Sequence, residues 1–183
     1  GCSGVQEKPE PTPLKRIDAV VELDEVESIS LGGGDQTGLA PAVQGEVVAA
    51  ASASGEVYLL NSELDAVWDV DLDRTILGGT ALNSTNVYVV TSDAVWVALA
   101  WGEGTKVFEP VLPGSATVPP VATDSLVFVK TQIGRILAVN AQTGATVWVE
   151  EAKESGVSIR GGSPMTLEGD ILFVLWGSGR IVA

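Results

Sequence analysis

The chain has 183 residues, and its 24 acidic and 10 basic residues give a net charge of −14 at pH 7. Proteins that bind nucleic acid use clustered Lys and Arg, so this acidic chain with scattered basic residues predicts no nucleic-acid partner. The sequence contains no histidine and one cysteine. Catalytic Ser/His/Asp and Cys/His groups and His-based metal sites are therefore excluded within these residues.

The one cysteine, Cys2, follows a small residue and precedes Ser3. Bacterial lipoproteins are cleaved directly before such a cysteine and acylated on it, so the position predicts that Cys2 is lipidated; the alternative is an incidental exposed thiol. Two or three acyl chains give stable membrane attachment, whereas one chain is marginal. Residues 3–16 alternate prolines with polar residues, a pattern that favours an extended tether.

A repeat with a period near 40 residues organises the chain from residue 39 onwards. Its units cover residues 39–72, 77–112, 116–152 and 158–183, and their closing aromatic residues recur every 40 positions, at Trp68, Phe108 and Trp148. Residues 17–23 form one further predicted strand, which we expect to complete another unit. A unit of this length cannot bury both of its faces alone, so the repeat implies stacked copies.

Each unit shows three short strands separated by turns, with a fourth, innermost strand near its opening residue (Pro41, Ala81, Pro120 or Pro164). Regular short strands without helical periodicity indicate an all-β fold. Four-stranded antiparallel units of this period predict the blades of a β-propeller, here an incomplete ring of about four blades. The last unit stops before its asparagine turn and aromatic residue, so we expect a fragment of a longer protein.

The third unit carries the family resemblance most clearly. Its residues 138–148, AVNAQTGATVW, match the A-x-N/D-x-x-T-G-x-x-x-W pattern of PQQ-like propeller repeats. In that superfamily the tryptophan docks against the neighbouring blade and the Thr-Gly pair forms a tight turn. The resemblance therefore assigns a structural, blade-docking role to Trp68, Phe108, Trp148 and Gly144.

Within that superfamily the chain resembles the lipoprotein subunits of the outer-membrane β-barrel assembly machine, over the N-terminal half of such a protein. The resemblance rests on the Cys2 start, the proline-rich tether, the phase of the repeat and residues 156–164, GVSIRGGSP. It implies a non-enzymatic scaffold, lipid-anchored on the periplasmic side of the outer membrane. It also implies that Val157, Ile159 and Arg160 bind periplasmic domains of the barrel-forming subunit, and that unfolded outer-membrane protein clients are further partners.

Other interpretations of the same residues remain open. Val157 and Ile159 can be buried strand residues, with Arg160 a solvated edge charge. The same fold also serves dehydrogenases that hold PQQ and calcium, or a generic binding module with another partner. We find neither the cofactor-binding residue set of those dehydrogenases nor a phosphate-binding loop, and predict no cofactor, no metal and no enzymatic activity. Carboxylate-rich residues 22–27 and 65–73 are interpreted as solvated outer faces.

Overall fold

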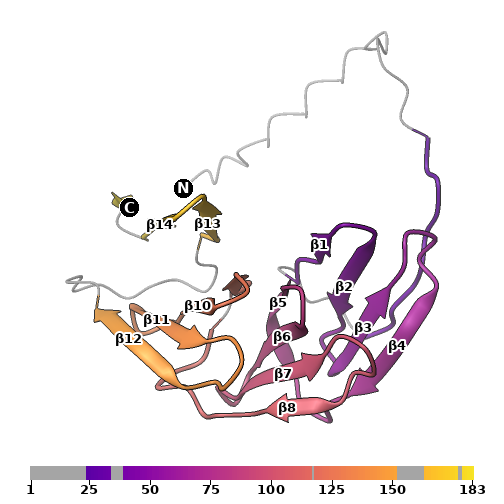
Figure 1. Ribbon diagram of the computed structural model, residues 1–183, viewed down its shortest axis with the longest axis horizontal. Coiled ribbons are helices and arrows are strands. Elements are labelled where there is room, and N and C mark those ends of the chain that lie inside the picture. Colours follow the sequence, from indigo (N-terminus) through magenta and orange to yellow (C-terminus); the bar gives the residue numbers. More distant parts are fainter. Residues whose placement is uncertain (1–23, 34–38, 117, 152–162, 177–178) are drawn as a thin grey trace, which may run out of the picture.

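The computed structural model describes residues 24–33, 39–116, 118–151, 163–176 and 179–183. Within these residues all regular structure is β, in four antiparallel sheets that lie side by side in an arc (Figure 1). Each sheet corresponds to one repeat unit, so the predicted all-β propeller of antiparallel blades is confirmed. The predicted strand over residues 17–23 lies outside the described residues.

The strands of each sheet follow one another in sequence order, from the concave side of the arc to its outer margin. The first blade contains β1 (Ala42–Gln44), β2 (Val47–Ala51), β3 (Glu56–Leu60) and β4 (Ala66–Asp71). The second contains β5 (Ile76–Leu82), β6 (Asn86–Thr91), β7 (Trp96–Ala100) and β8 (Lys106–Phe108). The third contains β9 (Val121–Ala122), β10 (Leu126–Lys130), β11 (Arg135–Asn140) and β12 (Thr146–Glu151). The described part of the fourth contains β13 (Met165–Glu168), β14 (Ile171–Leu175) and β15 (Ile181–Val182).

The innermost strand of each blade depends on its opening residue. Proline has no N–H to donate to a neighbouring strand, and β1, β9 and β13 all begin directly after the opening proline. In the second blade Ala81 takes the place of proline, and β5 runs through it for seven residues, the longest strand among those described. The Pro-to-Ala difference thus accounts for the length of β5.

The core lies between the blades and not inside any one of them. Along β6 successive side chains point to opposite faces of the sheet. Val87 and Val89 pack with the first blade, whereas Tyr88 and Val90 pack with the third. Both faces are covered, so the whole of β6 is buried. A third cluster joins the third and fourth blades.

Two of the closing aromatic residues contact a glycine of the following blade. A Cβ atom on Gly104 would lie 2.9 Å from the ring of Trp68, and one on Gly144 would lie 2.9 Å from the ring of Phe108. Real Cβ atoms do not approach this closely, and both glycines have positive φ, 67° and 73°. Close approach and backbone conformation therefore both require glycine at these two turns.

Trp148 lies differently within the described residues. Its ring is tilted against Phe128 of its own blade, with 6.0 Å between the ring centroids, and the residue is 40% exposed. For Trp148, packing against a following blade stays a prediction.

The substitution Gly144→Ala tests the aromatic–glycine contact. It should lower the free energy of unfolding by about 1–2 kcal/mol through the positive φ and by about 1–3 kcal/mol more because the Phe108 ring must shift. Gly45→Ala is the matched control, because Gly45 has a φ of 60° and open space where its Cβ would lie. Urea unfolding measures both variants, and equal losses would contradict the packing role.

Candidate functional site

The antiparallel topology gives the arc two different faces. Two turns of each blade lie at one end of the strands, here called the turn face. One joins the first strand to the second, and the other joins the third strand to the fourth. Connections between the second and third strands, and between blades, lie at the other end, here called the loop face. The described loop face comprises residues 52–55, 72–75, 92–95, 109–116, 118–120, 131–134, 163–164, 176 and 179–180.

The predicted partner-binding residues Val157, Ile159 and Arg160 lie in residues 152–162, outside the described part of the structure. The described residues on either side of this segment, Glu151 at the end of β12 and Ser163 just before β13, lie at the loop face by topology. Cys2, the predicted lipidation site, also lies outside the described residues.

The described residues on either side of that segment are bonded to side chains of the third blade. Before it, the Arg135 guanidinium forms an ion pair with Glu151 at 2.6 Å. After it, the Lys130 ammonium donates hydrogen bonds to Ser163 O at 3.3 Å and to Leu175 O at 2.6 Å. The third blade thus holds the residues that flank the predicted contact.

Lys130 is a feature that sequence reasoning missed. It is buried, and its ammonium also lies 4.9 Å from the centroid of the Trp176 ring. Carbonyl oxygens and an aromatic face stabilise a charge removed from water. In the repeat, Val90 of β6 holds the position of Lys130 in β10, and this exchange of valine for lysine was the available signal.

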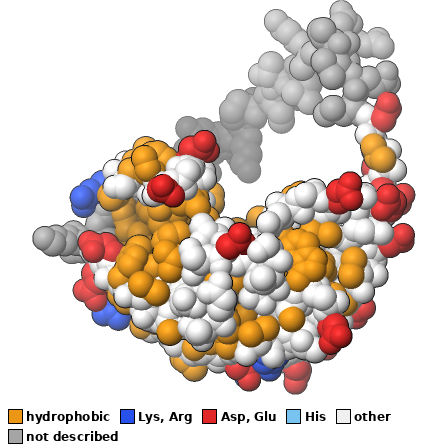
Figure 2. All heavy atoms as spheres, viewed as in Figure 1, with side chains coloured by type: hydrophobic (Ala, Val, Ile, Leu, Met, Phe, Trp, Pro, Cys, Tyr) orange, Lys and Arg blue, Asp and Glu red, His pale blue; other side chains and the backbone are white. Residues whose placement is uncertain are grey.

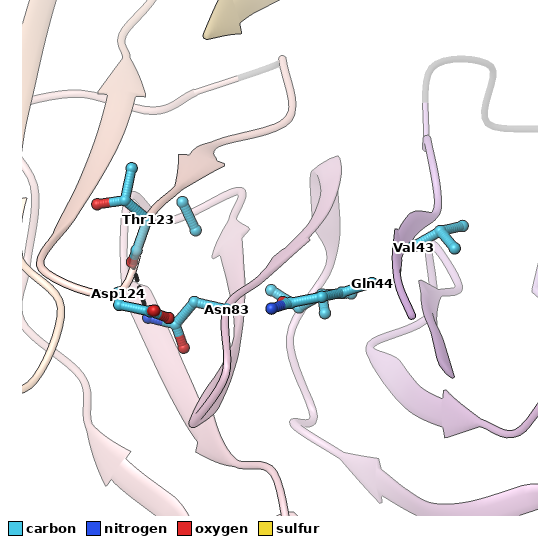
Figure 3. A pocket seen from close by; sticks show the side chains of 7 residues that line it. Val43, Gln44, Asn83, Thr123 and Asp124 are labelled. Carbon is cyan, nitrogen blue, oxygen red and sulfur yellow. Dashed lines mark hydrogen bonds between the residues drawn. The ribbon is translucent and has the colours of Figure 1, made fainter. Parts of the chain in front are cut away.

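On the turn face, a depression of about 420 Å³ lies between the first three blades (Figure 3). Gln44 reaches toward Asn83 from the first blade. The Asn83 amide donates to Thr123 O at 2.8 Å, and Asp124 accepts hydrogen bonds from Ser84 N (3.1 Å) and Oγ (2.7 Å). The bonds from Ser84 lower the pKa of the Asp124 carboxyl. These groups bond the second blade to the third, so we assign them a role in holding the two blades together and not in binding a ligand.

The interface between the first and second blades, here called the first joint, and that between the second and third blades, the second joint, satisfy corresponding carbonyl groups in different ways. In the first joint the indole N–H of Trp68 donates to Trp101 O at 2.7 Å. In the second joint Phe108 has no donor, and Ala141 O accepts a hydrogen bond from the Tyr88 hydroxyl at 2.9 Å instead. Burial raises the pKa of that hydroxyl, which also accepts hydrogen bonds from Asn83 and Asn86.

The described residues also limit the chemistry of the chain. Among them no three or more His, Cys, Asp or Glu side chains lie close enough together to hold a metal ion. Nor does this part of the chain include a helix long and apolar enough to cross a membrane. On the face shown in Figure 2, acidic side chains lie mainly along the outer margin and exposed apolar side chains form separate clusters.

Four-stranded blades with aromatic–glycine joints define this chain as a β-propeller of PQQ-like repeats. The family model described as "Outer membrane protein assembly factor BamB" matches residues 54–183. The chain therefore belongs to the BamB family.

Two curated relatives bear the same name. The assembly factor BamB of Burkholderia pseudomallei is 26% identical over 161 residues, which cover 87% of this chain and 42% of that protein. The BamB of Yersinia pestis is 28% identical over 187 residues, covering 94% and 48%. The chain spans about half the length of the curated relatives it matches.

Solved structures show the same fold. The crystal structure of BamB from Moraxella catarrhalis superposes with a TM-score of 0.68 at 24% identity, covering 78% of this chain and 43% of that chain. The quinohemoprotein alcohol dehydrogenase of Comamonas testosteroni superposes with a TM-score of 0.51 at 20% identity, covering 62% and 20%. At these identities the structural likeness shows the propeller fold alone.

The substitution Tyr88→Phe tests the polar part of the second joint. Removal of the hydroxyl takes a donor from Ala141 O and an acceptor from two buried amides, and should cost about 1–2 kcal/mol of unfolding free energy. Tyr58→Phe is the control, because the Tyr58 hydroxyl makes a longer bond of 3.3 Å to Leu31 O at a partly exposed site. Its cost should stay below about 0.5 kcal/mol. Thermal and urea unfolding compare the two, and a neutral Tyr88→Phe would contradict this account of the joint.

Proposed function

We propose that this chain is part of a non-enzymatic scaffold lipoprotein of the outer-membrane β-barrel assembly machinery. In this proposal it binds periplasmic domains of the barrel-forming subunit through Val157, Ile159 and Arg160 and aids insertion of outer-membrane proteins. The observation that carries the proposal is the BamB family match over residues 54–183, which includes this segment. The named relatives are assembly factors.

The physical chemistry of the segment supports a contact with another protein. Two aliphatic side chains on either side of an arginine can fill apolar pockets, while the guanidinium pairs with a carboxylate or with carbonyl oxygens. The residues that flank the segment, Glu151 and Ser163, are bonded to Arg135 and Lys130 of the third blade. Flanking residues that are already held in place reduce the conformational entropy lost when a partner binds beside them.

The proposal also includes a lipid anchor on Cys2 that places the propeller on the periplasmic side of the outer membrane. Residues 3–16 would serve as the tether, and an extended chain of that length reaches about 40 Å. This separation lets the loop face reach a partner at the membrane without burying the propeller in the bilayer.

Arg160→Ala and Arg160→Glu test the assigned contact in the intact protein. Each should weaken binding to the purified periplasmic domains of the barrel-forming subunit at least tenfold, about 1.4 kcal/mol, with the glutamate variant weaker because it repels any carboxylate partner. Lys106→Ala serves as control, because Lys106 is an exposed cation on β8 that pairs with Glu109 at 2.8 Å. Unchanged affinity and co-purification of both Arg160 variants would refute the contact.

Cys2→Ser tests the anchor separately. The variant protein should appear in the soluble periplasmic fraction, whereas the unsubstituted protein stays with the outer membrane because its acyl chains insert there. Cell fractionation and the mass of the N-terminal peptide measure both. If the unmodified thiol is found on membrane-extracted protein, the anchor is wrong.

A further inference from the structure

The two described joints on the loop face have the same backbone hydrogen bonds. In each, the connection between blades bonds to the hairpin turns on either side. In the first joint, Leu72 N donates to Gly55 O (3.0 Å) and Ser92 N donates to Thr75 O (2.7 Å). In the second joint, the corresponding bonds are Leu112 N to Ala94 O (2.8 Å) and Gln132 N to Ser115 O (2.8 Å). These bonds fix which residues of the two joints correspond, without reliance on sequence similarity.

Three positions that hold aspartate in the first joint hold apolar residues in the second. The first joint carries Asp71, Asp73 and Asp93, and the second carries Val111, Pro113 and Ile133. We call the second set the apolar patch.

An ion pair in the first joint is replaced by an apolar contact in the second. In the first joint Arg74 pairs with Asp93 at 2.6 Å. Thr91 and Arg74 together lower the pKa of the Asp93 carboxyl. In the second joint Gly114 stands in the place of Arg74, and a Cβ atom on it would lie 3.3 Å from the side chain of Ile133.

The apolar patch is exposed although the fold does not require apolar residues there. Val111 is 75% exposed and Ile133 is 59% exposed, and Pro113 is exposed as well. The first joint forms the same backbone bonds with three aspartates, so these positions tolerate charge. Single exposed aliphatic residues are common, but several at one joint of a chain with a net charge of −14 indicate an interaction surface.

Two neighbours of the apolar patch define what fits it. On one side Ile133 is two residues from Arg135, whose partner Glu151 directly precedes the segment with the proposed partner contact. On the other side Val111 forms a β-bridge with Val95, which brings the patch beside the acidic first joint. The apolar patch therefore lies beside the first joint, whose three aspartates outnumber its one arginine, Arg74.

We propose that the apolar patch is a second contact for the protein partner that binds residues 157–160, an inference that rests on the proposed function. The occupant is a folded domain of that partner which presents aliphatic side chains beside a lysine or arginine. The aliphatic groups cover Val111 and Ile133, and the basic group faces Asp71 and Asp73 of the first joint.

Ile133→Asp and Val111→Asp test the proposal, because the first joint already accommodates aspartate at both positions. Each should weaken the binding of the intact protein to the periplasmic domains of the barrel-forming subunit at least tenfold in calorimetry or interferometry. Val43→Asp is the matched control, since Val43 is 68% exposed but lies next to the turn face. Its affinity should stay within twofold. Thermal unfolding checks that each variant is folded. If Ile133→Asp does not fold, Ile133→Ser is used in its place, because Ser54 holds the corresponding position in the first blade.

The possible outcomes separate the two proposals. If Arg160→Ala weakens binding but Ile133→Asp and Val111→Asp do not, the patch is not a contact and the proposed function stands. If the unsubstituted protein does not bind the domains, the proposed function fails and this inference fails with it. If light scattering shows a dimer that Ile133→Asp dissociates, with partner binding unchanged, a second copy occupies the patch and the inference is overturned.

Discussion

The second and third blades are thin sheets with apolar side chains packed on both faces, and this constraint governs the rest of the structure. A single sheet of this kind cannot be stable in water, because strict alternation along strands such as β6 places half of its apolar residues on each side. The blades must therefore stack, and the outer edges must meet without gaps. The Trp68–Gly104 and Phe108–Gly144 contacts close the outer part of two joints, where only a residue without a Cβ admits the ring.

Much of the fold follows from sequence because the repeat is periodic. The polar side-chain contacts across the joints do not follow from it, because they differ from one joint to the next. The closing aromatics at 40-residue intervals and the opening prolines define the blades, and the structure has one sheet for each unit. The residues that meet across a joint, such as Tyr88 and Ala141, are far apart in sequence and carry no shared pattern. From sequence, Lys130 is the polar end of a strand; its carbonyl partners in the fourth blade follow only from the structure.

The candidate site is only partly accessible to the same reasoning. The assignment of Val157, Ile159 and Arg160 rests on resemblance to a family and not on a physical pattern, and these residues lie outside the described part of the structure. The apolar patch has no motif at all. The connections between blades differ in composition, but their backbone hydrogen bonds correspond. Only this correspondence shows that apolar residues of the second joint stand where the first joint has aspartates.

That correspondence explains why a repeat fold can acquire a specific surface without loss of stability. At the loop face the joints are held by main-chain bonds such as Leu72 N to Gly55 O and Leu112 N to Ala94 O, which do not depend on the side chains at 71, 73 and 93 or at 111, 113 and 133. Aspartates at one joint and aliphatic residues at the next are then both compatible with the same blade packing. Side chains at these positions are free to respond to selection for binding, whereas Gly104, Gly144 and the aromatics that touch them are not, because their substitution disturbs the packing of two blades at once.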